Sequence, residues 1–140
     1  MKVWDLETGD EHLSLEGHPG GVLTVCSVEN GGRTYLASAG ADSLVKVWDL
    51  ETGDEHLSLE GHTDGVRGVC SVENGGRTYL ASAGDDRTVK LWDLDLHTVL
   101  LDMNTPSAAH AVAATGTTLG IGLATGVLTL TVAPDRSPAR

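Results

Sequence analysis

Short runs of apolar residues alternate along the chain with clusters of Gly, Asn, Asp and Ser. This spacing predicts short β-strands joined by tight turns rather than helices. The segment Asn30-Gly31-Gly32 is typical of a hairpin turn, because Asn and Gly accept the positive φ that a tight loop requires. In the clearest stretch we expect four strands, at residues 21–28, 34–39, 45–50 and 56–59, and the same pattern again over 65–102.

A 44-residue period underlies this pattern. Residues 2–18 and 46–62 have the same sequence, and the pair Trp-Asp recurs at 4–5, 48–49 and 92–93. Self-similarity at a period of this length indicates a modular array, in which each unit buries the face of its neighbour. We expect a partial unit at 1–17 (third and fourth strands), full units at 18–61 and 62–105, a degenerate closing unit at 106–133 and a flexible tail at 134–140.

The closing unit departs from the repeat. Its Trp is missing, and Thr105-Pro106-Ser107 stands where Gly-His is due. Three strands are still expected, at 109–113, 118–123 and 127–132. Terminal units of an array are often atypical, because they face a different neighbour on one side. Since this unit lacks the polar residues of the others, we expect packing alone to hold it.

Three motifs recur in the same order and register over residues 1–104: Gly-His, Leu-Ala-Ser-Ala-Gly-x-Asp and Val-Lys-x-Trp-Asp. They resemble the WD-repeat family of β-propellers, in the style of its bacterial members. The resemblance implies an all-β fold, a partial β-propeller of about three antiparallel four-stranded blades. In that family the propeller is often the C-terminal part of a larger chain that carries an NTPase, kinase or protease module.

The resemblance also implies a buried relay of His, Ser, Asp and Trp within each intact blade. Buried polar side chains must be paired, so such a network fixes the geometry between strands. A catalytic interpretation is weaker, since the set occurs twice in register and no Gly-x-Ser-x-Gly nucleophile motif is present. We therefore predict a structural role and no enzyme activity. The predicted members are His18, Ser38, Asp42 and Trp48 in the first full blade and His62, Ser82, Asp86 and Trp92 in the second.

Comparison of residues 2–45 with 46–89 shows where the two copies differ. Seven of 44 aligned positions differ, just after Gly-His and around the Asp of the turn between the second and third strands. In the WD-repeat arrangement both places lie at the narrow end of the central channel, where partners commonly dock. Drift after a recent duplication is the alternative, but it would also change the other turns, which are identical. We predict a partner-binding surface that comprises Leu23, Asp64, Arg67, Asp85 and Arg87.

Composition narrows the choice of partner. The formal net charge of −11 disfavours nucleic acid and anionic membrane surfaces. Cys26 and Cys70 lie one repeat apart in apolar runs, which is typical of reduced core residues rather than a metal site. His12 and His56 each follow Asp-Glu, and we expect them on a solvated face. With no signal peptide and no long apolar run, we expect a cytoplasmic protein, and we expect no cofactor.

These observations favour a non-catalytic scaffold that binds a protein or peptide on the narrow face of a propeller. The alternatives are a regulatory or sensor portion of a larger enzyme, and a gene remnant without independent function. The expected strands number thirteen, whereas a closed propeller needs about four to eight blades of four strands. We therefore expect the chain to be the C-terminal end of a larger propeller. In the alternative, two chains exchange strands to form a ring of about six blades.

Overall fold

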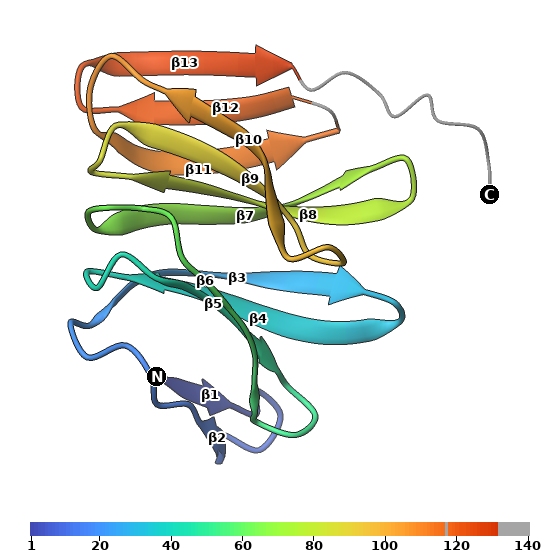
Figure 1. Ribbon diagram of the computed structural model, residues 1–140. Helices are drawn as coiled ribbons and strands as arrows, with labels where there is room; N and C mark the ends of the chain where they lie inside the picture. The colour runs from blue at the N-terminus through green and yellow to red at the C-terminus, as the bar shows by residue number, and fades with distance from the viewer. Residues whose placement is uncertain (117, 132–140) are drawn as a thin grey trace.

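The computed structural model describes residues 1–116 and 118–131, and all regular structure in these residues is β (Figure 1). Thirteen strands form four antiparallel sheets, of two, four, four and three strands in chain order. The predicted all-β fold with four-stranded antiparallel blades is confirmed. The predicted tail and residues 132 and 133 lie outside the described residues. No helix capable of spanning a membrane occurs in the described part of the chain.

Each full blade is a meander of four strands that pair in sequence order. In both blades the first two strands are joined by a two-glycine turn, with φ values of 61° and 77° at Gly31 and Gly32. Positive φ at both central residues is what the common two-residue hairpin loop requires. The predicted strands of the first full blade agree with the observed ones to within two residues. The first blade comprises β3 (Val22–Asn30), β4 (Arg33–Gly40), β5 (Val45–Asp49) and β6 (Glu55–Leu59), and the second comprises β7 (Val66–Asn74), β8 (Arg77–Gly84), β9 (Thr88–Asp93) and β10 (Thr98–Asn104).

Two smaller sheets flank the full blades. At the N-terminal end, β1 (Lys2–Trp4) and β2 (Glu11–Ser14) form a two-stranded hairpin. The C-terminal sheet comprises β11 (Ala109–Thr115), β12 (Thr118–Leu123) and β13 (Gly126–Thr131). The three strands predicted for the closing unit are therefore present over its described residues.

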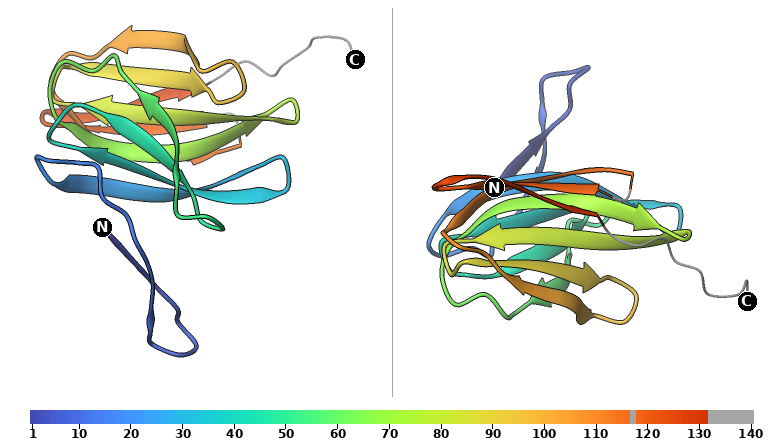
Figure 2. Two further views of the ribbon diagram at one scale, coloured as in Figure 1. Left: turned by 60° about the horizontal axis from the view of Figure 1, so that its bottom comes forward. Right: turned by 90° about the horizontal axis from the view of Figure 1, so that it is seen from above.

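The sheets are stacked face to face, with the first strands β3, β7 and β11 side by side (Figures 1 and 2). The stack ends at the C-terminal sheet without returning to the first blade. The described residues therefore form a partial, unclosed propeller. The β1–β2 hairpin projects away from the first blade (Figure 2).

The second blade packs against a different neighbour on each of its two faces, because successive residues of a strand point to opposite sides of the sheet. We call the face towards the N-terminal neighbour the upstream face, and the opposite one the downstream face. In β8, Leu80 lies on the upstream face and packs with the first blade, whereas Ala81 lies on the downstream face and packs with the C-terminal sheet. Both side chains are fully buried. The second blade thus has an apolar layer on each side.

The two cysteines lie at the margins of these layers. Cys26 packs against the layer between the first and second blades, and Cys70 against the layer between the second blade and the C-terminal sheet. Both are free and partly buried. Burial raises the pKa of Cys26 to about 12, with nearby Cys70 adding to the shift, and raises the pKa of Cys70 to about 11. Both thiols therefore stay protonated at neutral pH.

Candidate functional site

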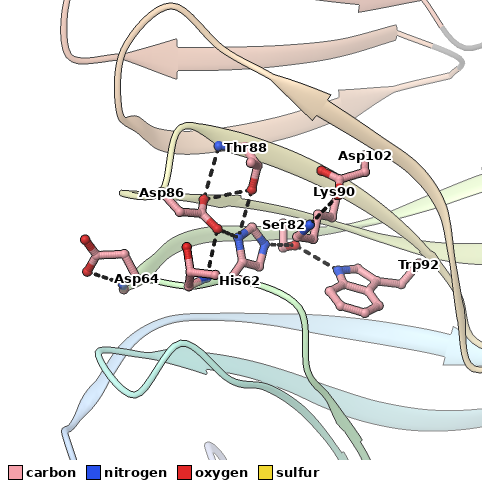
Figure 3. A network of polar contacts seen from close by, with 10 residues as sticks. His62, Asp64, Ser82, Asp86, Thr88, Lys90, Trp92 and Asp102 are labelled. Atoms are coloured by element: carbon pink, nitrogen blue, oxygen red, sulfur yellow. Dashed lines mark hydrogen bonds and ion pairs between the residues drawn. The ribbon is translucent and has the colours of Figure 1, made fainter.

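The relay residues of the second blade come from four separate places in the chain. His62 lies between β6 and β7, Ser82 on β8, Asp86 in the β8–β9 turn and Trp92 on β9. His62 Nδ1 is 2.9 Å from Asp86 Oδ2, and His62 Nε2 is 2.6 Å from Ser82 Oγ. Trp92 Nε1 donates to the same Oγ at 2.8 Å. The four side chains form one continuous hydrogen-bonded chain across the blade (Figure 3).

The groups at the two ends of the relay determine the direction of its hydrogen bonds. Trp92 Nε1–H can only donate, and the ionised Asp86 carboxylate can only accept. Ser82 therefore accepts from Trp92 and donates to His62 Nε2, while His62 Nδ1 carries the proton that faces Asp86. Thr88 completes the network, because its Oγ1 donates to Asp86 Oδ1 at 2.7 Å and lies 3.2 Å from His62 Nδ1 (Figure 3).

The electrostatics agree with these directions. Burial lowers the pKa of His62, and the Asp86 carboxylate opposes this shift only in part. For Asp86, burial acts to raise the pKa, but hydrogen bonds from Thr88 and from the backbone N–H of Thr63, together with His62, leave it below its ordinary value. At neutral pH, His62 is therefore neutral and Asp86 is ionised.

The first blade contains the same arrangement. His18 Nε2 is 2.8 Å from Ser38 Oγ, Trp48 Nε1 donates to Ser38 Oγ at 2.8 Å, and His18 Nδ1 is 3.0 Å from Asp42 Oδ2. Leu44 stands where the second blade has Thr88, so the additional hydroxyl contacts are missing. The structure thus places all eight predicted relay residues in two hydrogen-bonded relays, one in each full blade.

The arrangement suits structural support better than catalysis. Ser38 and Ser82 are both fully buried, and each hydroxyl group is engaged by a Trp donor and a His acceptor. A nucleophilic hydroxyl must be reachable by substrate and free to lose its proton to a base. Among the described residues, no buried side-chain nitrogen or oxygen lacks a partner. The relay therefore connects strands and presents no reactive group to solvent.

The C-terminal sheet has polar contacts of its own. The strand pairing puts Ile121 in the register of Ser82, so the relay cannot form there. However, Thr105 Oγ1 donates to the Ser107 carbonyl at 2.7 Å, and Ser107 Oγ is 2.9 Å from Thr125 Oγ1. The prediction that packing alone holds this unit is wrong. The Ser107–Thr125 contact joins the segment before β11 to the β12–β13 turn, as His62 and Asp86 do in the second blade.

Positions that differ between the two copies meet where the first and second blades adjoin. Gly65 lies at the centre: a β-carbon placed on it would be 3.7 Å from Leu23 Cδ1 and 3.4 Å from Asp85 Oδ2. Arg67 Nε donates to both carboxylate oxygens of Asp85 at 2.8 Å. The structure therefore brings three of the five predicted partner-binding residues together. We call Leu23, Gly65, Arg67 and Asp85 the junction cluster.

Asp64 and Arg87 lie at the rim of this cluster. Asp64 Oδ1 accepts from the N–H of Gly65 at 2.7 Å (Figure 3). Arg87 is exposed and has a φ of 62°, in the left-handed region that side chains other than Gly rarely adopt. Ser43, the equivalent residue of the first blade, has a φ of 66°. In residues 1–116 and 118–131 the Arg87 guanidinium makes no ion pair.

His110 is a further polar neighbour that comparison of the two copies missed. It lies on β11, and its Nε2 is 3.4 Å from Asp85 Oδ1. Asp85 therefore connects the second blade to the C-terminal sheet. His110 stands at the β-bulge of β11, in the position of Leu23 in β3 and Arg67 in β7. The 44-residue spacing instead aligns His110 with Val22 and Val66, so only the strand pairing reveals this correspondence.

The opposite end of the blades is polar and the same in both copies. A cavity of about 350 Å³ lies between the two Asn-Gly-Gly turns, and Glu29, Arg33 and Glu73 are among its lining residues. His56 is exposed and stacks on Tyr35, with ring centroids 4.8 Å apart. In the described part of the chain, no group of three or more His, Cys, Asp or Glu side chains could hold a metal ion.

The comparisons with known proteins agree with this geometry. The family profile described as "WD domain, G-beta repeat" matches residues 9–49 and 53–93, which is more than half of the chain. The chain belongs to the WD-repeat family. No curated protein matches its sequence.

Two solved structures illustrate the likeness of this WD-repeat chain to designed proteins. The crystal structure of the computationally designed Ika4 protein is 28% identical with a TM-score of 0.81, and the match covers 94% of this chain and 79% of that one. The computationally designed Ika8 protein is 29% identical with a TM-score of 0.80, over 94% of this chain and 39% of that one. The chain thus spans about two fifths of the length of Ika8.

Proposed function

We propose that this WD-repeat chain is a non-catalytic scaffold that docks a protein or peptide at the junction cluster, on the narrow end of the propeller. The observation that carries the proposal is the convergence around Gly65. Leu23 belongs to one blade and Arg67 and Asp85 to the next, yet they meet at one place. These are positions at which two otherwise near-identical copies differ.

The chemistry of the cluster suits a peptide that carries a carboxylate beside an apolar side chain. Leu23 is 44% exposed, which leaves an apolar surface for such a side chain. Arg67 uses its Nε to bind Asp85, so its terminal nitrogens can donate to a partner. Arg87 supplies a second guanidinium, and Arg is the side chain that best matches the fork of a carboxylate. Asp64 at the rim and Asp85 within the cluster would orient a donor on the same peptide.

The wider setting follows from charge and family. A net charge of −11 supports a protein partner over nucleic acid or an anionic membrane surface. We place this function in the cytoplasm of a bacterial-type WD-repeat protein. WD repeats generally act as interaction scaffolds, and the buried relays support a structural role for the polar residues inside the blades.

The proposal can be tested with peptides selected from a displayed random library on the immobilised full chain. Binding of a selected peptide is then measured by fluorescence polarisation. We expect the double charge reversal Arg67→Glu with Arg87→Glu to raise the Kd by about tenfold or more, because two charge-assisted contacts are lost. Circular dichroism must show that the fold is retained.

The matched control reverses two exposed charges at the other end of the blades, Glu51→Lys with Asp54→Lys. This variant should bind the peptide as the parent does. If instead the control loses binding and the Arg67/Arg87 variant keeps it, the docking surface lies elsewhere and the proposal is wrong.

A further inference from the structure

The first and second blades carry the same apolar residues on their upstream faces, but only one of these faces is covered. In the second blade Val66 and Val69 are 0% and 6% exposed, because the first blade packs against them. Their counterparts Val22 and Val25 are 36% and 51% exposed. The same two valines therefore form an open apolar surface on the first blade.

The chain itself shows what kind of surface covers such a face. The upstream face of the second blade packs against the downstream face of the first, where Ala37 and Ala39 on β4 lie beside Val47 and Val45 on β5. The pattern is two small residues on the second strand of the blade, each paired with a β-branched residue on the third strand. The same pattern recurs in the second blade at Ala81, Ala83, Leu91 and Val89, with Leu in place of one valine.

The C-terminal sheet presents this pattern uncovered. Gly120 pairs with Thr129 and Gly122 with Val127, in the register of the Ala–Val pairs of the first blade. Val127 is 80% exposed and Thr129 is also exposed. The neighbouring residues of β13, Leu128 and Leu130, point the other way and pack on the second blade. The downstream face of the C-terminal sheet is thus a free surface of the type that covers an upstream face.

We propose that two copies of this chain associate head to tail, with the C-terminal sheet of each copy covering the upstream face of the first blade of the other. Two copies contribute six blade-sized sheets, which lies inside the range of about four to eight at which propellers close. Three copies would contribute nine sheets, which lies outside that range. A closed pair buries both open faces at once and has a two-fold axis.

The β1–β2 hairpin must rearrange in this pair. In the repeat it corresponds to a third and fourth strand, although it projects away from the first blade (Figure 2), and β13 of the other copy would take the place of β1. The hairpin is weakly held, since Trp4 is 54% and Leu6 is 99% exposed, and a two-stranded hairpin alone is marginally stable in water. Displacement of β1 lets β2 pair with the free edge of β13 as a fourth strand.

The test is the mass of the purified 140-residue chain in solution, by light scattering during gel filtration and by sedimentation equilibrium. We expect a discrete species of twice 14.6 kDa. Val25→Glu and Thr129→Lys should each raise the dimer Kd by about a hundredfold or more, because each buries an unpaired charge at both interfaces. The matched control is Val99→Glu, which changes a valine of 39% exposure on β10 outside the proposed interface and should leave the dimer intact.

Mixing the Val25→Glu and Thr129→Lys variants provides the sharper test. A heterodimer has one unaltered interface and one in which the introduced carboxylate of the first variant meets the introduced ammonium group of the second. The mixture should therefore recover dimers that neither variant forms alone. A parent chain that is a monomer overturns the proposal, as does a trimer or an open series of larger species. A dimer that Val25→Glu does not weaken would also overturn it. This inference does not depend on the docking surface proposed above.

Discussion

Replacement of Ser82 by alanine probes the relay with almost no change in volume. Ser82 Oγ accepts from Trp92 Nε1 at 2.8 Å and donates to His62 Nε2, 2.6 Å away. The site is fully buried, so water cannot replace the missing hydroxyl group. The Trp92 indole N–H and His62 Nε2 would lose their partner, and each unpaired group costs about 1–3 kcal/mol of stability.

The expected loss of unfolding free energy is therefore about 2–6 kcal/mol. This is a large share of the 5–15 kcal/mol that is typical of whole domains, and it corresponds to a fall in Tm of roughly 10 °C. Urea denaturation followed by circular dichroism measures the loss, at one fixed protein concentration because any association shifts apparent stability.

Two further variants make the result specific. Ser71→Ala removes a hydroxyl group on β7 of the same blade that is not part of the relay, and it should change stability by less than about 0.5 kcal/mol. In a Trp92→Phe background, which already lacks the indole donor, Ser82→Ala should cost about 1 kcal/mol less than in the parent. A Ser82→Ala chain that unfolds at the parent's urea concentration would refute the assignment of a structural relay.

Two other predictions follow from pKa values. Burial lowers the pKa of His62 in the folded chain. Below the ordinary histidine pKa of about 6.5, the unfolded chain therefore binds more protons than the folded chain. The contribution of His62 to stability should be complete above that pH and decline as the pH falls towards the folded pKa. The urea midpoint should therefore drop between pH 7.5 and 5.5, and His62→Gln should show a smaller pH dependence; an unchanged dependence would contradict the argument. The pKa values of Cys26 and Cys70 are about 12 and 11. Both thiols should therefore react slowly with Ellman's reagent at pH 8 in the native chain and rapidly in guanidinium chloride. Fast reaction of the native chain would show that the thiols are more accessible than the structure indicates.

The strands and turns could be predicted because the information is local. Asn30-Gly31-Gly32 determines a turn through its own backbone preferences, and the observed φ values at both glycines match. The relay partners could be named from the resemblance to WD repeats, since each belongs to a motif. The Ser107–Thr125 contact could not, because neither residue has a motif counterpart and the two are 18 positions apart.

Burial was the property that local sequence could not determine. Val25 and Val69 occupy the same place in near-identical repeats, yet one is 51% exposed and the other 6%. The difference depends only on which sheet lies beside each valine in space. The junction cluster is an intermediate case. Sequence comparison found Leu23, Arg67 and Asp85, but the contacts around Gly65 and the approach of His110 depend on how the blades are arranged in space.

Asp86 has a consequence for how such chains can diversify. It holds the β8–β9 turn from the inside, through the backbone N–H groups of Thr63 and Thr88. Its neighbour Asp85 contacts Arg67 and His110, and its neighbour Arg87 is exposed. The first blade has Ala41 and Ser43 at these two places, and the turn keeps nearly the same φ at the second of them. Backbone shape and surface chemistry are thereby decoupled, so a new recognition specificity can arise by exchanging two side chains per blade. The same two positions are the natural choice for a randomised library.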